Sequence, residues 1–226
     1  MNKKIIAIIP ARGGSKSVPK KNIKDLAGKP MIAYIIESAL KVKLLDRVIV
    51  STENEEIAEV ARRFGAEVPF IRPAELATDE MPTLPVIQHA VRTLEEKENY
   101  VPDYVLLVYP TSPLLKAERI EEALQMAVNN DSDSVISGSF DYGHYWEQVE
   151  GGYRRLSPLK LENRQQSKPL FVENGAIYLT KTKILKKQLV ADKADVLIMP
   201  EKENVDVDYP EDFEKVATIM KMRSGV

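Results

Sequence analysis

The residues best suited to chemistry lie in a basic turn near the start of the chain, ARGGSKSVPKKN at residues 11–22. An apolar run, residues 5–9, leads directly into it. Gly13 and Gly14 have no Cβ, so the backbone approaches a ligand closely, and successive backbone N–H groups in such a turn form a concavity that binds anions. Because α/β sheets bind nucleotides just beyond the first strand, the turn predicts a polyphosphate site. Between residues 11 and 30 cations far outnumber acids, with Arg12, Lys16, Lys20, Lys21, Lys24 and Lys29 against Asp25.

A simpler interpretation of this turn stays open from the residues alone. The turn fits neither the pattern G-x-x-x-x-G-K-[ST] nor the pattern G-x-G-x-x-G. Lysines are usually solvated, and a pair of glycines also suits an ordinary turn. The spacing by itself therefore favours phosphate binding only modestly.

A pair of carboxylates forms the second candidate site. Asp206 and Asp208 flank Val207 in VDVDYPEDF, residues 205–213. In extended backbone, residues i and i+2 face the same side, so the two carboxylates converge, and Mg²⁺ typically binds one or two carboxylates together with water and substrate phosphates. Acids also gather before a helix because they complement its dipole, and Pro210 opens a predicted helix. The residues alone give both interpretations equal weight.

Further polar positions also admit two interpretations each. Arg72 lies in a Pro-flanked loop after a predicted strand, where it would contact a ligand or form a surface ion pair. Thr111 and Ser112 follow an apolar strand, in the crevice where α/β sheets bind ligands, and the same residue types form Ser/Thr turns. Asn174 precedes Gly175, and this dipeptide is also a strong signal for a hairpin turn.

Alternating strand and helix patterns must position these residues. Apolar strand-like runs cover 5–9, 48–51, 67–70, 104–108, 134–138, 176–179 and 196–199. Apolar residues at helical spacing predict helices over 31–41, 55–64, 84–97, 117–129 and 211–223. We expect Pro30 at the first position of a helix and Gly65 at a C-terminal cap. The alternation predicts a three-layer α/β fold, in which helices cover both faces of a mostly parallel mixed sheet.

Residues 139–171 break this rhythm. They hold the only tryptophan, several tyrosines, the Gly151–Gly152 pair and the polar stretch ENRQQSK. The segment predicts an extended arm inserted into the sheet topology, and its aromatic groups suit a subunit interface. The alternative is a long active-site loop that packs on its own protomer.

Composition narrows the class of protein. With 226 residues the chain suits one substantial core, so we expect a single domain over 1–226. A formal net charge of −2 suggests no nucleic-acid partner. The chain has no cysteine, which excludes disulfides, thiol nucleophiles and thiolate metal sites. The apolar runs are too short to span a bilayer, and Pro10 ends the first run too early for a signal peptide. We therefore expect a cytoplasmic protein with no membrane partner.

Several segments, in order along the chain, resemble motifs of one family. ARGGSKSVPKKN resembles the first motif of the acylneuraminate cytidylyltransferases, the CMP-sialic acid synthetase family. The segments RPAELATDEMPT (72–83), PTSPL (110–114), RQQSKPLFVENGAIYL (164–179) and VDVDYPEDF (205–213) resemble its later motifs. The resemblance covers nearly the whole chain. It implies a Rossmann-like nucleotidyltransferase fold and a CTP-dependent cytidylyltransferase that uses Mg²⁺, joins CMP to an acidic nine-carbon sugar and releases pyrophosphate.

The resemblance also implies roles for single residues. It assigns the nucleotide to Arg12, Gly13, Gly14, Ser15, Lys16, Lys21, Asn22, Arg72 and Thr83. It assigns the sugar to Tyr109, Thr111, Ser112, Arg164, Gln165 and Asn174. It assigns the metal to Asp206 and Asp208, and catalysis to Arg12, Lys21 and Asp208. In the family, the region that corresponds to the arm helps to form a dimer and reaches the partner's active site, so we expect a homodimer.

Two departures from the family bear on the sugar. The family often has Gln where this chain has Tyr109, and commonly has Arg where it has Leu115. These residues would suit a sugar with a less polar substituent than N-acetylneuraminate, such as legionaminic acid; the alternative is that both side chains only pack beneath the site. Rival functions are a nucleotidyltransferase for Kdo or a neutral sugar, and a nucleotide-binding module without catalysis.

Overall fold

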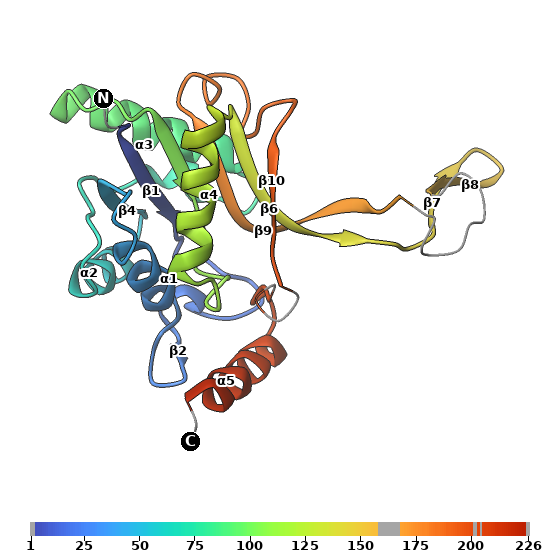
Figure 1. Ribbon diagram of the computed structural model, residues 1–226. Coiled ribbons are helices and arrows are strands. Elements are labelled where there is room, and N and C mark those ends of the chain that lie inside the picture. The colour runs from blue at the N-terminus through green and yellow to red at the C-terminus, as the bar shows by residue number, and fades with distance from the viewer. Residues whose placement is uncertain (1–2, 158–167, 201–202, 204, 225–226) are drawn as a thin grey trace.

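A six-stranded sheet forms the centre of the computed structural model, which describes residues 3–157, 168–200, 203 and 205–224 (Figure 1). The strand order is β10-β6-β9-β5-β1-β4. β9 runs antiparallel to both of its neighbours, and the other pairs are parallel. The predicted mostly parallel mixed sheet is therefore confirmed. Its strands are β1 Ile5–Pro10, β4 Arg47–Ser51, β5 Tyr104–Leu107, β6 Ser134–Asp141, β9 Leu170–Lys181 and β10 Asp195–Ile198.

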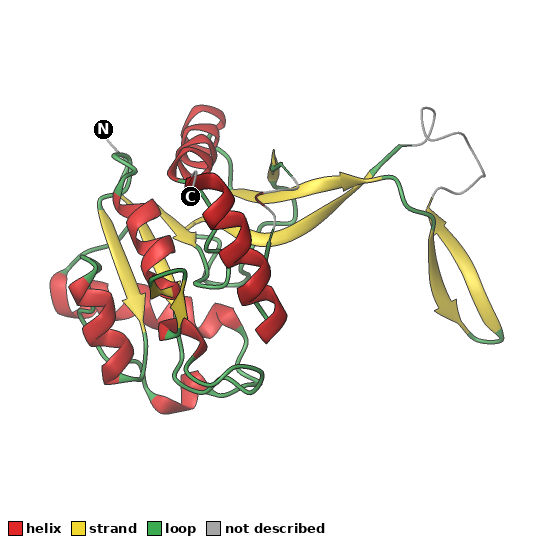
Figure 2. Cartoon of the chain, turned by 90° about the horizontal axis from the view of Figure 1, so that it is seen from below, coloured by secondary structure: helices red, strands yellow, loops and turns green. Residues whose placement is uncertain are grey.

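Helices cover both faces of this sheet (Figures 1 and 2). Along β1, Ile5, Ala7 and Ile9 pack into one core with α1, α2 and α4, whereas Ile6 and Ile8 pack into a second core with α3. Because both faces are covered, the strand is an unbroken apolar run. Within the described residues, no helix combines the length and the apolar character that a membrane span requires. The helices are α1 Met31–Leu40, α2 Glu55–Arg63, α3 Thr83–Glu98, α4 Ala117–Asn130 and α5 Pro210–Ser224.

Two local predictions are wrong and one is confirmed. Residues 67–70 form no strand, and only Glu67 makes a bridge to β4. Pro69 cannot donate a ladder hydrogen bond, so the pairing stops there. Pro30 precedes α1 as its N-cap instead of opening it. Gly65 follows the last turn of α2 with a φ of +92°, as expected for a glycine that ends a helix.

A short hairpin between the basic turn and α1 was not predicted. β2 (Asp25–Leu26) and β3 (Lys29–Pro30) are joined by Ala27 and Gly28, which both have positive φ. This is the backbone of a type I′ turn. Alanine is not a usual residue at the first of these positions, which explains why the sequence pattern gave no hairpin signal.

The predicted arm leaves the body as a ribbon made by the far halves of β6 and β9 (Figures 1 and 2). Their antiparallel pairing continues outward to Asp141 opposite Leu170. Beyond it, β7 (Tyr145–Val149) and β8 (Gly152–Ser157) form a hairpin at the tip. The structure therefore confirms an arm inserted between two sheet strands. Residues 158–167 lie outside the described part of the chain.

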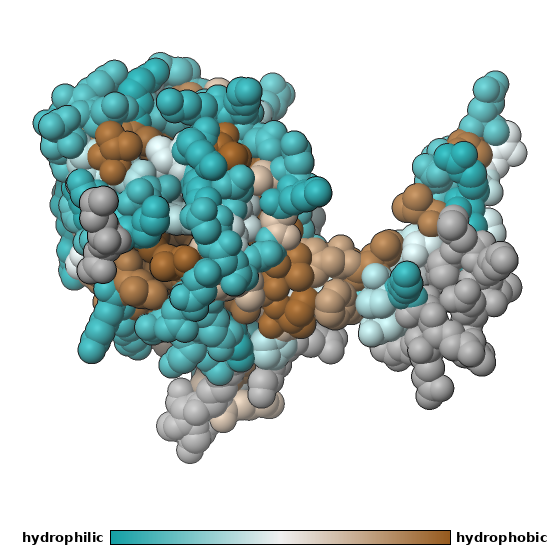
Figure 3. Space-filling view, turned by 45° about the horizontal axis from the view of Figure 1, so that its top comes forward, coloured by the Kyte–Doolittle hydropathy of each residue, from teal (hydrophilic) through white to brown (hydrophobic). Residues whose placement is uncertain are grey.

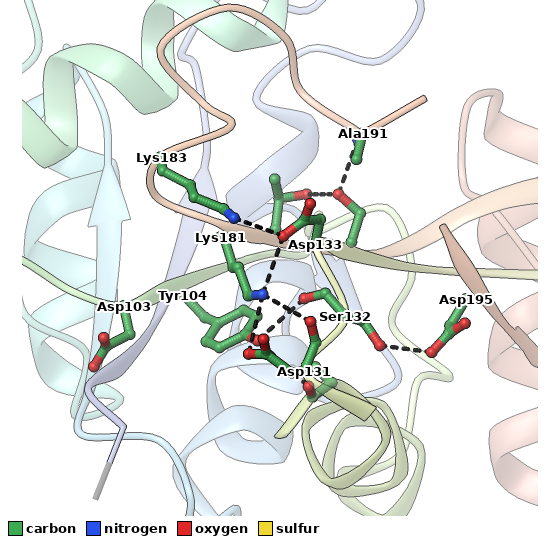
Figure 4. A network of polar contacts seen from close by, with 12 residues as sticks. Asp103, Tyr104, Asp131, Ser132, Asp133, Lys181, Lys183, Ala191 and Asp195 are labelled. Atoms are coloured by element: carbon green, nitrogen blue, oxygen red, sulfur yellow. Dashed lines mark hydrogen bonds and ion pairs between the residues drawn. The ribbon is translucent and has the colours of Figure 1, made fainter. Parts of the chain in front are cut away.

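An ion-pair network lies at the edge of the sheet where β5 begins, and it fastens the end of β9 (Figure 4). Lys181 Nζ lies 3.0 Å from a carboxylate oxygen of Asp131 and 3.0 Å from one of Asp133. It also donates to the backbone oxygen of Asp131 at 2.7 Å. Lys183 pairs with Asp133 at 3.0 Å. The network ties the last residues of β9 to the segment between α4 and β6.

Candidate active site

A cavity of about 510 Å³ lies beyond the ends of β1 and β5, at the carboxyl edge of the sheet. This is the edge where α/β folds bind nucleotides. The predicted residues that line it are Arg12, Ser15, Lys16, Lys21, Asn22, Arg72, Thr83, Tyr109, Thr111 and Asp208. Gly14 lines a smaller hollow that shares Arg12 and Lys16 with the main cavity. Arg164 and Gln165 lie outside the described residues.

The basic turn is held from inside the protein. Asn22 is buried and donates its side-chain amide to the Arg12 carbonyl oxygen at 2.9 Å. Gly13 donates its backbone N–H to Glu53 Oε1 at 2.6 Å. A Cβ on Gly13 would lie 2.6 Å from Nδ2 of Asn54, the N-cap of α2. A side chain at position 13 would therefore displace the Asn54 side chain that caps α2, and the Gly13 N–H is already bonded to a carboxylate.

Arg12 and Lys16 share one carboxylate across the cavity. Arg12 Nη1 lies 2.6 Å from Asp79 Oδ1, and Lys16 Nζ lies 2.7 Å from Asp79 Oδ2. The bond from Lys16, followed by the charge of Arg12, holds the pKa of Asp79 below its usual range. Gly14 is open, because no atom lies within 4 Å of where its Cβ would be. The turn thus presents two cations beside an accessible stretch of backbone.

Lys21 joins the basic turn to the paired carboxylates. Its Nζ lies 3.0 Å from the Val207 carbonyl oxygen and 3.0 Å from Asp208 Oδ1, across 187 residues of sequence. Ser17 Oγ donates to the Asp208 backbone oxygen at 2.6 Å. Val207 is fully buried, and its N–H donates to the Thr111 carbonyl oxygen at 2.8 Å. Two motifs from opposite ends of the chain therefore form one site.

Asp206 and Asp208 lie on either side of buried Val207, and neither carboxylate caps the helix that follows. That role belongs to Asp212, whose carboxylate accepts the backbone N–H of Asp208 at 2.9 Å and of Tyr209 at 2.8 Å. This is the reciprocal bond of a capping box at the start of α5. Asp212 thus provides the acid at the start of the helix. Asp206 and Asp208 are therefore left for a different role.

The surroundings of Asp206 disfavour its charged form. Burial raises the pKa of Asp206, a hydrogen bond from Thr111 lowers it, and the charge of Asp208 raises it again, so that the pKa lies above its usual value. A cation beside both carboxylates would offset this repulsion. No group of three or more His, Cys, Asp or Glu side chains in the described residues is arranged to hold a metal. The donor set fits an ion such as Mg²⁺ that takes further oxygens from phosphate and water.

Arg72 is buried, and its ion pair is internal instead of at the surface. Its Nη2 lies 2.9 Å from Glu53 Oε2, and its backbone N–H donates to the Thr52 carbonyl oxygen at 2.8 Å. Its Nε has no hydrogen-bond partner in the described structure. Because Glu53 binds Gly13 with its other oxygen, it links the basic turn to the Arg72 loop. Sequence analysis missed Glu53, whose signal was its position just after β4.

Tyr109 lines the cavity, and Tyr178 packs with it against the second core. The Tyr109 hydroxyl lies 3.0 Å from Oγ1 of Thr83, the first residue of α3. Tyr178, on β9, donates to Glu173 Oε2 at 3.0 Å. Burial is the main cause that raises the pKa of both tyrosines, and the charge of Asp206 adds to it in both. Sequence analysis missed Tyr178 and Glu173, because strand residues of this kind carry no signal of their own.

Leu115 does not line the cavity and packs beneath it, which is one of the two interpretations that the sequence left open. It is 2% exposed and packs in the core with α1 and α4. Two tight turns follow β5: Ser112 N–H donates to the Tyr109 carbonyl oxygen, and Leu115 N–H donates to that of Ser112. They direct Leu115 back into the protein, while Tyr109 stays in the cavity wall. The buried Ser112 thus lies in the turn that was its alternative interpretation.

Asn174 and Gly175 form no hairpin turn, because β9 continues through them. The pairing of β9 with β6 shifts register here, and Gly175 has a φ of +72°, as in a bulge. Asn174 Oδ1 accepts from Ser137 Oγ at 2.6 Å and from the Ala176 N–H at 3.1 Å. The side chain therefore holds the bend where β9 leaves the sheet for the arm.

These features define a class of protein: an α/β fold of the nucleotide-binding type whose carboxyl edge holds a cavity lined by cations and by Asp208 of the carboxylate pair. The profile of the cytidylyltransferase family matches residues 6–223. The chain belongs to this family and is a nucleotidyltransferase.

Relatives with named activities align along nearly the whole chain. The pseudaminic acid cytidylyltransferase of Campylobacter jejuni is 31% identical, covering 97% of this chain and 97% of its own. The CMP-N,N'-diacetyllegionaminic acid synthase of Legionella pneumophila is 30% identical with the same coverage of both chains. The N-acylneuraminate cytidylyltransferase of Escherichia coli is 31% identical over 99% of this chain, which spans 54% of that protein.

Solved structures share the fold at lower identity. The CMP:2-keto-3-deoxy-manno-octonic acid synthetase complexed with CTP superposes with a TM-score of 0.71 at 20% identity, covering 97% of this chain and 99% of that chain. The 4-diphosphocytidyl-2C-methyl-D-erythritol synthase from Anaerococcus prevotii superposes with a TM-score of 0.70 at 15% identity, covering 98% and 100%. The predicted nucleotidyltransferase fold is confirmed.

Proposed function

We propose that the protein transfers CMP from CTP to a sialic-acid-like acidic sugar of nine carbons and releases pyrophosphate. The observation that carries this proposal is the contact between Lys21 and Asp208, which joins the cationic turn to the segment of the paired carboxylates at one cavity. The named activities of the aligned relatives support it, since all three make CMP derivatives of this sugar class or transfer cytidylyl groups to it.

The reaction needs alignment and charge stabilisation more than covalent chemistry. The anomeric hydroxyl of the sugar attacks the α-phosphorus of CTP. The new O–P bond forms as the bond from the α-phosphorus to the bridging oxygen breaks; that oxygen leaves with pyrophosphate, and the hydroxyl proton passes to solvent. Negative charge grows on the phosphoryl and leaving oxygens. Arg12, Lys16 and Lys21 surround the cavity with cations that stabilise this charge. The enzyme forms no covalent intermediate in this scheme.

Asp206 and Asp208 are the residues that we propose hold Mg²⁺. When bound, such an ion polarises the phosphoryl group and favours ionisation of the attacking hydroxyl. Lys21 bonds both Asp208 and the Val207 carbonyl oxygen, so it fixes the direction of the Asp208 carboxylate. The side-chain hydrogen bond from Thr111 lowers the pKa of Asp206 and so favours its charged form.

The apolar surface of the arm supports the proposal of a homodimer. Phe140, Leu170 and Val172 are exposed where the ribbon leaves the body, and Figure 3 shows apolar side chains gathered there. A contiguous exposed apolar surface is typical of a subunit contact. Light scattering should give twice the mass of one chain, and Phe140→Ser with Val172→Ser should give one chain. A wild-type mass of one chain at working concentration contradicts this assembly.

The choice of sugar is supported by fewer observations than the choice of nucleotide. Tyr109 lines the cavity with its hydroxyl 3.0 Å from Thr83 Oγ1, and a tyrosine there suits a sugar with amide and methyl substituents. The absence of cysteine supports a reducing compartment such as the cytoplasm.

A pyrophosphate-release assay tests the function as a whole. Each of the four nucleoside triphosphates is combined with N-acetylneuraminic, legionaminic and pseudaminic acids and with Kdo. We expect release with CTP and one or more of the nine-carbon acids. Release with Kdo alone supports the rival nucleotidyltransferase, and no release with any pair supports a binding module without catalysis.

A further inference from the structure

The carboxylate of Asp79 forms ion pairs with two cations of the basic turn. Each oxygen of Asp79 meets a different cation, Arg12 Nη1 at 2.6 Å and Lys16 Nζ at 2.7 Å. Asp79 lies in the loop between the short helix η2 (Ala74–Ala77) and α3, so the contact closes across the cavity from a separate segment. A phosphate group would meet the same two cations with two of its oxygens.

We propose that Asp79 is an exchangeable internal anion of the polyphosphate site. It gives up Arg12 and Lys16 when the phosphate chain of the nucleotide binds, and it takes them back as pyrophosphate leaves. The proposal rests on the proposed function, because that function assigns both cations to the phosphate chain.

Exposure separates this carboxylate from the other acid that touches the turn. The side chains of Asp79, Arg12 and Lys16 are 34%, 35% and 84% exposed. Ion pairs this accessible contribute little to stability, so Asp79 exchanges at small cost. Glu53 is different, because it pairs with the buried Arg72 and also accepts the Gly13 N–H. Removing a partner from a buried pair of that kind is costly, so Glu53 stays in place when ligand binds.

A polyphosphate has the advantage in this competition. It carries more negative charge than one carboxylate, and its several oxygens accept charge-assisted hydrogen bonds. The low pKa of Asp79, caused first by the bond from Lys16, keeps it anionic near neutral pH. Asp79 therefore competes with every ligand that uses these two cations. Its effect is to weaken the retention of pyrophosphate as well as the binding of CTP.

The experiment compares Asp79→Asn with Glu80→Gln, a matched control. Glu80 is the next residue, is exposed, and does not line the cavity, so its variant loses the same charge from the same loop. Calorimetry with pyrophosphate and with CTP should show about threefold to thirtyfold tighter binding in Asp79→Asn, which corresponds to the loss of two exposed pairs. Glu80→Gln should change neither affinity by more than about twofold.

Turnover kinetics provide the second measurement. Asp79→Asn should lower KM for CTP and lower the inhibition constant of pyrophosphate, with kcat unchanged or reduced by slower product release. Asp79→Ala should change both constants in the same direction, which guards against an effect peculiar to asparagine. Equal or weaker binding in Asp79→Asn overturns the proposal, as does an equal gain in Glu80→Gln.

Arg12→Ala separates this failure from a failure of the proposed function. If Arg12→Ala binds CTP as tightly as wild type, the turn is not the polyphosphate site and the functional assignment falls. If Arg12→Ala weakens CTP binding while Asp79→Asn gains nothing, only the exchange by Asp79 is wrong.

Discussion

The two ends of the sheet hold cations in opposite ways. At the edge where β5 begins, Lys181 is 12% exposed and is matched by Asp131 and Asp133 together (Figure 4). At the opposite edge, Arg12 and Lys16 share the carboxylate of Asp79 at the wall of the cavity. Both regions show short ion pairs, so distance alone does not separate a structural pair from a site for ligands.

The difference lies in how many partners each cation has and how far water reaches them. Lys181 has acceptors on three sides, including the Asp131 backbone oxygen, and needs no ligand. Lys16 is 84% exposed and, among the described residues, has one ion-pair partner, which an incoming anion replaces. The network at the first edge contributes to folding, and the cations at the second edge contribute to binding.

Loss of a paired carboxylate should give the largest effect at the binding edge. Asp206→Asn and Asp208→Asn should each lower kcat by at least about a hundredfold, because the site loses a proposed metal ligand. Excess chelator should have the same effect on wild type. Thermal unfolding should stay close to wild type, since neither carboxylate caps α5. Full turnover by either variant would show that these acids hold no required ion.

Loss of a cation in the basic turn should have the second largest effect. Arg12→Ala and Lys21→Ala should weaken CTP binding about tenfold to a hundredfold, the usual worth of a charge-assisted hydrogen bond. Lys20→Ala is the matched control, because Lys20 pairs with Glu56 instead of lining the cavity. Calorimetry gives the three affinities. Equal losses in all three variants would mean that the turn acts only through its overall charge.

A substitution at the edge where β5 begins should lower stability and leave CTP binding unchanged. Lys181→Ala should lower the unfolding temperature by about 2–6 °C and leave KM for CTP unchanged. Lys183→Ala is the control, since it removes one exposed pair with Asp133 and should change the unfolding temperature less. Differential scanning calorimetry and steady-state kinetics check both halves. A changed KM with an unchanged unfolding temperature would reverse the assignment of the two edges.

Lowering the pH should reveal the smallest of these differences between the two edges. The bonds from Lys181 hold the pKa of Asp131 and Asp133 below 3.8. The folded state therefore binds fewer protons than the unfolded state, and the stability from these acids is present above about pH 4 and is lost below it. In the metal-free site the pKa of Asp206 lies above 3.8, so protons compete with the proposed Mg²⁺ for this carboxylate at a higher pH than they reach the acids at the other edge. As pH falls, kcat/KM should decline before the unfolding temperature does; simultaneous decline would contradict this order.

The sequence predicted most of the fold because its signals are local. The apolar run of β1 and the glycine after α2 depend only on neighbouring residues, and both predictions agree with the structure. The strand over 67–70 failed because Pro69 outweighs the apolar pattern. The sequence left two interpretations of Leu115 open because the two tight turns that direct it into the core are invisible in a side-chain pattern.

The site was predicted as separate pieces, and the contacts between them were not. Lys21 and Asp208 are 187 residues apart, so no spacing rule brings them together. Asp79 and Glu53 were missed as partners of the basic turn because an acid in a loop gives no indication of which cation it meets. The resemblance to the family located the pieces, and the roles of Arg12 and Lys21 in catalysis remain predictions.

The position of β9 in the sheet has a consequence for biosynthesis. β9 lies between β5 and β6, although it follows both in sequence. A nascent chain that ends before residue 170 can build the β5-β1-β4 half, but β5 then has an unpaired, apolar edge. Exposed edges of this kind pair with other chains and aggregate. The sheet closes only when the strand that returns from the arm has been synthesised, so chains truncated within the arm should accumulate as insoluble material.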